Sequence, residues 1–182
     1  MEGCECCRIG RHGGEGYQKI VVKLEGGWVL NHCKWGERTY LGYLILQTKE
    51  HREDIGDLHP KEVNALGNNL KLINCQLREY WAKIFSEDPI ELVHVAYLNE
   101  TPHINRHIYL SSKIQLLRES HVHMHLLTRT KKMGEALGYC AEKIGWHLLD
   151  NVDKFPDKYK VSDKDDKKVI KLMNYLNNSL GI

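Results

Sequence analysis

The sequence lacks a long apolar run, a large excess of charge of one sign and any repetitive or linker-like segment. No stretch approaches the roughly 18 apolar residues that a bilayer-spanning helix requires, and the opening residues, MEGCECCRIG, lack the apolar core of a signal peptide. We therefore expect a cytoplasmic protein with no membrane partner. A formal net charge of +2 also argues against binding to duplex nucleic acid, while small anionic phosphates remain suitable ligands.

The composition is that of an ordinary globular chain. Its 182 residues, 42% hydrophobic and 27% charged, suit one domain with its own core. Six cysteines in a reducing compartment are expected to be thiols or metal ligands rather than disulfides. Eleven histidines exceed ordinary usage, so their clustering directs the search for a functional site.

The hydrophobic pattern predicts five strands and three helices. β-Branched, aromatic and alternating segments place the strands at 19–24, 28–31, 40–48, 91–98 and 121–128. Apolar residues at helical spacing place the helices from Pro60 to about Phe85, at 133–147 and at 163–180. Because the strands come before and after the long helix instead of alternating with helices, we expect an α+β fold with an antiparallel sheet.

We expect a single domain over residues 1–182 with additions at both ends. Residues 1–16 are rich in glycine, cysteine and charge and have no hydrophobic periodicity, which predicts an irregular segment that a bound metal would order. Residues 131–182 are expected to form a C-terminal helical extension. Residues 99–120 are expected to be an insertion between the last two strands.

The most informative segment is 121–127, where three histidines alternate with apolar residues. In a strand, His121, His123 and His125 share one face, with about 7 Å between successive side chains. That arrangement suits a polyanion, with one neutral imidazole as nucleophile and the others as hydrogen-bond donors. Two alternatives stay open, namely a metal site and a chance cluster of surface histidines.

A second motif is the CxxC spacing of Cys4 and Cys7, which lets two thiolates bind one tetrahedral zinc ion through a tight turn. The motif alone is weak, because a redox pair or an incidental pair has the same spacing. A zinc site needs two further ligands, and His51 and one histidine of the 121–125 cluster are the candidates.

The pattern of residues 121–127 resembles the signature of the histidine-triad superfamily: His, apolar, His, apolar, His, apolar, apolar. The likeness continues in the segment from Gly42 to His51 and in the long helix that follows it, and covers roughly residues 4–129. The sequence departs from the family at Tyr43, where many members have histidine, and residues 99–120 are longer than the common turn.

The resemblance implies a nucleotide hydrolase that releases a nucleoside monophosphate from a dinucleoside polyphosphate, a nucleoside phosphoramidate or a related adduct. His123 would attack the α-phosphorus to form a nucleotidyl-histidine intermediate, and His125 would contact the phosphate or leaving group. Asn31, which a turn role explains equally well, would face the ribose, and Asn99 would contact the phosphate. Alternatives are a nucleotidyltransferase of the galactose-1-phosphate uridylyltransferase type and a non-catalytic, zinc-stabilised nucleotide-binding module.

The resemblance also implies a metal and an assembly. In zinc-containing members the first histidine of the triad joins the CxxC pair and the histidine after the earlier strand. Carried over to this sequence, the ligands would be Cys4, Cys7, His51 and His121, and the zinc would be structural because four protein ligands close its coordination. The family commonly forms homodimers, so a homodimer is expected.

Overall fold

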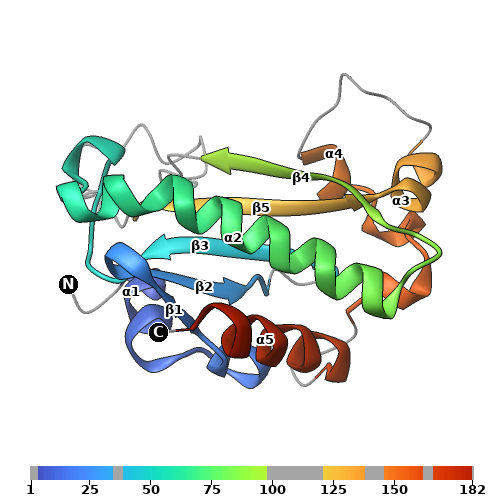
Figure 1. The fold of residues 1–182 in the computed structure, drawn as a ribbon, viewed down its shortest axis with the longest axis horizontal. Helices are drawn as coiled ribbons and strands as arrows, with labels where there is room; N and C mark the ends of the chain where they lie inside the picture. Colours follow the sequence, from blue (N-terminus) through green and yellow to red (C-terminus); the bar gives the residue numbers. More distant parts are fainter. Residues whose placement is uncertain (1–3, 35–38, 98–120, 138–145, 162–165, 182) are drawn as a thin grey trace, which may run out of the picture.

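The fold is built around a five-stranded antiparallel sheet in the order β1-β2-β3-β5-β4 (Figure 1), which confirms the expected α+β class. The computed structural model describes residues 4–34, 39–97, 121–137, 146–161 and 166–181. The strands are β1 Val22–Leu24, β2 Trp28–His32, β3 Tyr43–Thr48, β4 Ile90–Tyr97 and β5 His123–Thr130. All five lie close to the segments predicted from the sequence.

Five α-helices surround the sheet in the described residues: α1 Glu5–His12, α2 Pro60–Ile84, α3 Lys131–Ala136, α4 Trp146–Leu149 and α5 Lys167–Leu180. Short 3-10 helices are η1 Gly16–Lys19, η2 Glu25–Gly27, η4 Ile55–Asp57, η6 Val152–Lys154 and η7 Asp157–Tyr159. Helices α3 and α4 lie at the two ends of the helix expected at 133–147, and residues 138–145 are outside the described ranges. None of these helices, within the described ranges, is long and apolar enough to cross a membrane.

The long helix α2 begins at the predicted proline because several side chains secure its first turn. His59 is the N-cap, Pro60 supplies a first-turn residue with a suitable φ, and Glu62 completes a capping box. Glu62 is 1% exposed and forms an ion pair with Arg52 at 3.0 Å. Trp28 of β2 donates its indole N–H to the Glu62 carbonyl at 2.8 Å, which ties the helix to the sheet.

The two faces of the sheet have different roles, which the antiparallel register determines. Leu44, Leu46 and Leu126 are almost fully buried in the core on the α2 side. Their neighbours along each strand point the other way, so Ile45 lies between Asn31 of β2 and His125 of β5 on the opposite face. That second face therefore carries the polar side chains, and helix α1 lies on it.

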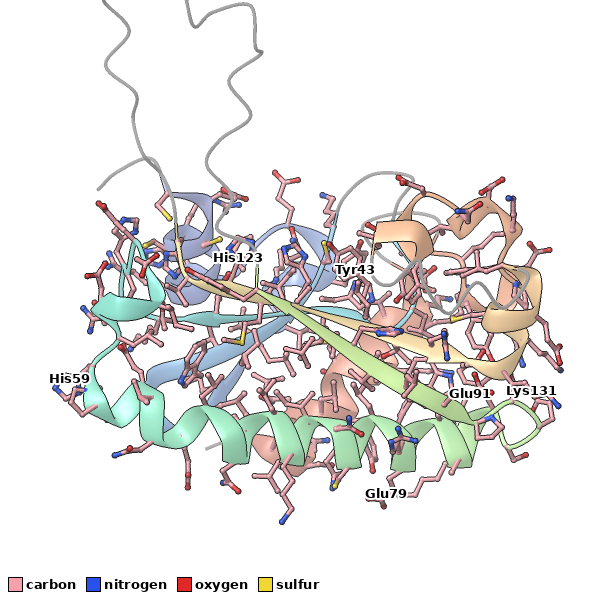
Figure 2. The ribbon with its side chains drawn as sticks, turned by 90° about the horizontal axis from the view of Figure 1, so that it is seen from above. Tyr43, His59, Glu79, Glu91, His123 and Lys131 are labelled. Atoms are coloured by element: carbon pink, nitrogen blue, oxygen red, sulfur yellow. The ribbon has the colours of Figure 1, made fainter. Side chains whose placement is uncertain are left out.

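The C-terminal segment contributes to the core as well as extending it. Helix α5 packs against α2 and β1, on the core side of the sheet (Figures 1 and 2). Its apolar stripe is fully buried: Val169, Leu172, Met173 and Leu176. Asp166 caps the helix through hydrogen bonds from the backbone N–H groups of Lys168 and Val169.

The expectation of an irregular N-terminal segment is wrong, because residues 5–12 form helix α1. Cys4 is the N-cap, and its sulfur accepts a hydrogen bond from the backbone N–H of Cys7. Glu5 lies in the first turn, and Arg11 and His12 lie in the last, so charges at both ends complement the helix dipole. Capping and end charges therefore favour a helix where hydrophobic periodicity is too short to indicate one.

Candidate metal centre and histidine pocket

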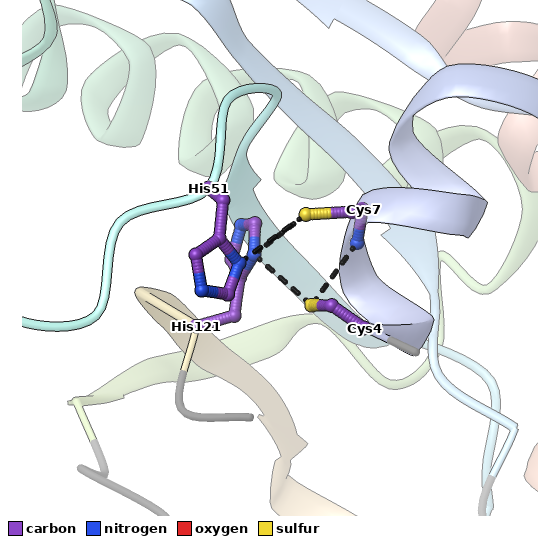
Figure 3. A group of neighbouring side chains, drawn as sticks. All are labelled: Cys4, Cys7, His51 and His121. Carbon is purple, nitrogen blue, oxygen red and sulfur yellow. Dashed lines mark hydrogen bonds between the residues drawn. The ribbon is translucent and has the colours of Figure 1, made fainter. Parts of the chain in front are cut away.

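Four side chains from three separate segments converge at the start of α1. Cys4 and Cys7 come from the N-terminal segment, His51 follows β3, and His121 precedes β5 (Figure 3). Their ligand atoms all lie within 4.8 Å of one another, and three of the four residues are buried. The structure thus places together all four residues that the resemblance implied, in a Cys2His2 cluster that could hold a metal ion.

Both histidines of this cluster direct Nδ1 towards sulfur. Nδ1 of His121 lies 3.4 Å from each cysteine sulfur, and Nδ1 of His51 lies 3.4 Å from the Cys7 sulfur. On the other side of its ring, Nε2 of His121 lies 2.8 Å from the Thr48 carbonyl oxygen. An Nε2–H that donates to this carbonyl leaves the Nδ1 lone pair for a metal, and histidine ligands usually donate their other ring N–H in this way.

The two thiols have different acidities. A hydrogen bond from the Cys6 side chain is the largest cause of a strongly lowered pKa at Cys4, and the backbone N–H of Cys7 adds to it. Burial raises the pKa of Cys7, and a hydrogen bond to Cys4 raises it further. Two adjacent buried thiolates repel each other, so a dication between them would be required to keep both ionised. This donor set fits zinc.

His123 lies two residues further along the chain and faces a different space. Its Nδ1 lies 2.7 Å from the backbone carbonyl oxygen of His121, so the N–H there is donated to the main chain. The remaining nitrogen, Nε2, then carries the lone pair. Its ring centroid lies 4.9 Å from that of His125. A neutral imidazole in this tautomer is chemically suited to nucleophilic attack through Nε2.

His125 is 4% exposed and contacts a tyrosine from the neighbouring strand. Its Nδ1 lies 2.7 Å from the hydroxyl oxygen of Tyr43. Figure 2 shows His123 and Tyr43 on the side of the sheet opposite α2. The sequence singled out Tyr43 only as a departure from the family pattern, not as a partner of the third histidine.

His123 and His125 line a cavity of about 530 Å³. Its floor is the polar face of the sheet, to which β2 and β3 contribute Asn31, Tyr43, Ile45 and Gln47. Its wall comes from the N-terminal segment and includes Glu5, Cys6, Arg8, Ile9, Glu15 and Gln18. Such a volume is in the range of small-molecule sites.

The wall of the cavity and the metal cluster share helix α1. The Gln47 amide donates to the Cys6 carbonyl at 2.7 Å, which links the helix to the floor beside His123. Arg8 is held towards Glu5 of the same helix by hydrogen bonds, one of them 2.7 Å long. This wall was not predicted from the sequence, in which the N-terminal segment had been assigned to metal binding alone.

Of the two asparagines expected at the nucleotide, one can be placed. Asn31 is 2% exposed, lines the cavity and donates its Nδ2–H to the His32 carbonyl at 3.3 Å. Its Oδ1 has no hydrogen-bond partner within the described part of the chain, so it remains available to a ligand donor such as a hydroxyl group. Asn99 lies outside the described residues.

Comparison of the chain with protein-family models and with curated proteins finds no match in either set. The features that bear on function are therefore the geometry of the histidines, the cavity and the Cys2His2 cluster.

Proposed function

We propose that this protein is a nucleotide hydrolase of the histidine-triad type, in which His123 is the nucleophile and zinc fills the Cys2His2 cluster. The observation that carries the proposal is the orientation of His123. A backbone carbonyl takes the Nδ1–H, so Nε2 presents a lone pair in a cavity large enough for a nucleotide.

The proposed reaction has two displacements at one phosphorus. Nε2 of His123 forms a bond to the α-phosphorus while the bond from phosphorus to the leaving group breaks, and the leaving group departs with the electron pair. Water then attacks the same phosphorus and loses a proton to the solvent, the electron pair of the N–P bond returns to Nε2 of His123, and the nucleoside monophosphate is released. His125, adjacent to His123, donates a hydrogen bond to the phosphoryl group, where negative charge develops.

Zinc in the cluster would be structural. Cys4, Cys7, His51 and His121 supply four protein ligands of the types zinc prefers and would leave no open coordination position for substrate. Its chemistry would be to hold both thiolates and so to fix α1 against the sheet. The pocket side chains of α1, including Arg8, depend on that placement.

A substrate panel tests the proposal. Untagged protein is incubated with a dinucleoside tetraphosphate, a nucleoside 5′-phosphoramidate and a nucleoside diphosphate sugar in ¹⁸O-labelled water. Mass spectrometry then follows the products and any nucleotidyl adduct on the protein. We expect ¹⁸O in the released monophosphate and an acid-labile nucleotidyl group on the peptide that contains His123.

Other outcomes would redirect or reject the proposal. Transfer to an added sugar phosphate in preference to water would indicate a nucleotidyltransferase. Tight binding of a nucleoside monophosphate with neither turnover nor adduct would indicate a non-catalytic binding module. A nucleotidyl group on a residue other than His123 would reject the assignment of the nucleophile.

A further inference from the structure

Tyr43 lies beside His125 on the neighbouring strand. The register pairs Ile45 with His125 and Tyr43 with Leu127, so Tyr43 is the diagonal neighbour of His125 on the same face of the sheet. Diagonal cross-strand neighbours are about 7–8 Å apart at Cα, within reach of a long aromatic side chain. The phenol spans this separation and brings its oxygen to 2.7 Å from Nδ1 of His125.

The surroundings hold the phenol in place. Tyr43 is completely buried, and the ring of Tyr40 stacks on it with centroids 6.0 Å apart and planes 27° apart. Gly42, directly before it, has a φ of 93°, and a Cβ there would lie 2.9 Å from the Trp81 ring. The backbone turn directly before Tyr43 therefore depends on glycine.

We infer that Tyr43 is a positioning residue, whose hydroxyl donates to Nδ1 of His125 and so fixes the Nε2–H tautomer of that histidine towards the cavity. A phosphoryl oxygen can only accept hydrogen bonds, so it requires a donor from His125. The phenol hydroxyl has a proton that it can donate, and Nδ1 of His125 accepts it when the ring proton is on Nε2. In the pocket, His123 thus presents the lone pair of its Nε2, and the neighbouring His125 presents an Nε2–H.

Nuclear magnetic resonance of ¹⁵N-histidine-labelled protein tests the tautomer directly. Long-range ¹H–¹⁵N correlations report which ring nitrogen carries the proton, and comparison with His125→Gln identifies the signals of His125. We expect Nε2–H with Nδ1 unprotonated in the wild type, and a mixture of tautomers in Tyr43→Phe. A wild-type His125 protonated at Nδ1, or no change in Tyr43→Phe, would overturn the inference.

Tyr40→Phe is the matched control. It removes a buried hydroxyl, which donates to the Thr128 carbonyl at 2.9 Å, from a tyrosine stacked on Tyr43 but not bonded to His125. We expect this variant to keep the wild-type tautomer of His125, whereas a change like that of Tyr43→Phe would mean that packing, and not the hydroxyl, decides the tautomer.

The kinetic consequence rests on the proposed function. With a nucleotide substrate, Tyr43→Phe should lower kcat/KM about tenfold through kcat, and Tyr40→Phe should change it less than about twofold. Equal losses in the two variants would overturn the positioning role. If no nucleotide is turned over, the proposed function fails, while the resonance measurement still decides the state of the Tyr43 and His125 pair.

Discussion

His121 and His123 lie two residues apart, and a backbone carbonyl fixes one ring nitrogen of each, but not the same nitrogen. In His121 the carbonyl of Thr48 lies against Nε2, and Nδ1 faces two sulfur atoms. In His123 the carbonyl of His121 lies against Nδ1, which leaves Nε2 as the basic nitrogen at the cavity. The ring nitrogen that contacts a backbone carbonyl thus differs between His121, the candidate metal ligand, and His123, the proposed nucleophile.

His32, outside the 121–125 cluster, has the same carbonyl contact as His123. His32 of β2 also has Nδ1 against a carbonyl, that of Cys33 at 2.7 Å, as His123 has. However, His32 is completely buried, with the ring of Tyr17 edge-on at 5.2 Å, and it does not line the cavity. His32 and His123 therefore share the contact between Nδ1 and a backbone carbonyl but differ at Nε2. The Nε2 atom of His32 is enclosed in the core, which suits a structural histidine. His123 lines the cavity, which suits a candidate nucleophile.

The largest expected effect is the loss of turnover on removing the nucleophile. We predict that His123→Ala lowers kcat/KM by roughly 10⁴-fold or more, because it removes the atom that forms the covalent intermediate. His125→Ala should cost roughly 10²- to 10³-fold, because it removes one donor to the phosphoryl group. Steady-state kinetics with bound zinc verified in each variant provide the measurement.

Two results would contradict the separate roles of these histidines. Equal residual rates for His123→Ala and His125→Ala on a substrate with a good leaving group would count against the assignment of the nucleophile. Loss of zinc from His123→Ala would mean that the two histidines do not have separate roles.

The next effect concerns the metal. We predict that Cys4→Ser and Cys7→Ser each lose zinc and about 15 °C in melting temperature, corresponding to roughly 5 kcal/mol of stability, because α1 loses its attachment to His51 and His121. Cys75→Ser, at an exposed cysteine of α2, is the control and should retain both. Metal analysis of untagged protein and calorimetry provide the measurements.

Zinc below about half an equivalent in the wild type, with both ligand variants unchanged in melting temperature, would exclude a structural metal. The same experiment separates structural from catalytic zinc. If zinc is structural, chelated protein should still form the nucleotidyl adduct on His123, with a higher KM because α1 lines the pocket. Loss of adduct formation before loss of the fold would contradict that role.

The sequence was sufficient for the strands and for the shared face of His123 and His125, because strand periodicity is local, whereas His121 precedes β5 and belongs to the Cys2His2 cluster. It was not sufficient for the cluster of Cys4, Cys7, His51 and His121. Spacing within the chain says nothing about three segments separated by up to 117 positions, and only the likeness to a family predicted their convergence. The structure brings them together through the pairing of β3 with β5.

The features that sequence reasoning missed have physical explanations. Helix α1 was missed because eight residues are too few for an apolar period and cysteine is not a usual N-cap residue, although the acidic first turn and basic last turn gave a signal. The contact of Tyr43 with His125 depends on cross-strand register, which the order of residues does not contain. The face of β3 that carries Gln47 could have been deduced from strand alternation.

The smallest expected effect tests the structural histidine of the comparison. Burial lowers the pKa of His32 from 6.5 to about 4, against opposing contributions from the carbonyls of Cys33 and Tyr40 and the charge of Asp166. Between these two pKa values the unfolded chain binds a proton that the folded chain does not. The stability from a neutral His32 is therefore complete above pH 6.5 and is lost as the pH falls towards 4, by roughly 3 kcal/mol.

His32→Asn isolates this contribution, because its amide can still donate to the Cys33 carbonyl but does not titrate. We predict that the wild type is more stable than the variant at pH 7, since the larger ring fills the buried site, and that this advantage shrinks by roughly 3 kcal/mol at pH 4. Urea unfolding at both pH values measures the difference. Release of zinc in acid should affect the two proteins alike, so it does not change the difference between their free energies of unfolding. An advantage that does not change with pH would show that His32 has the same pKa in the folded and unfolded protein, and that enclosure of the second nitrogen is not what distinguishes it from His123.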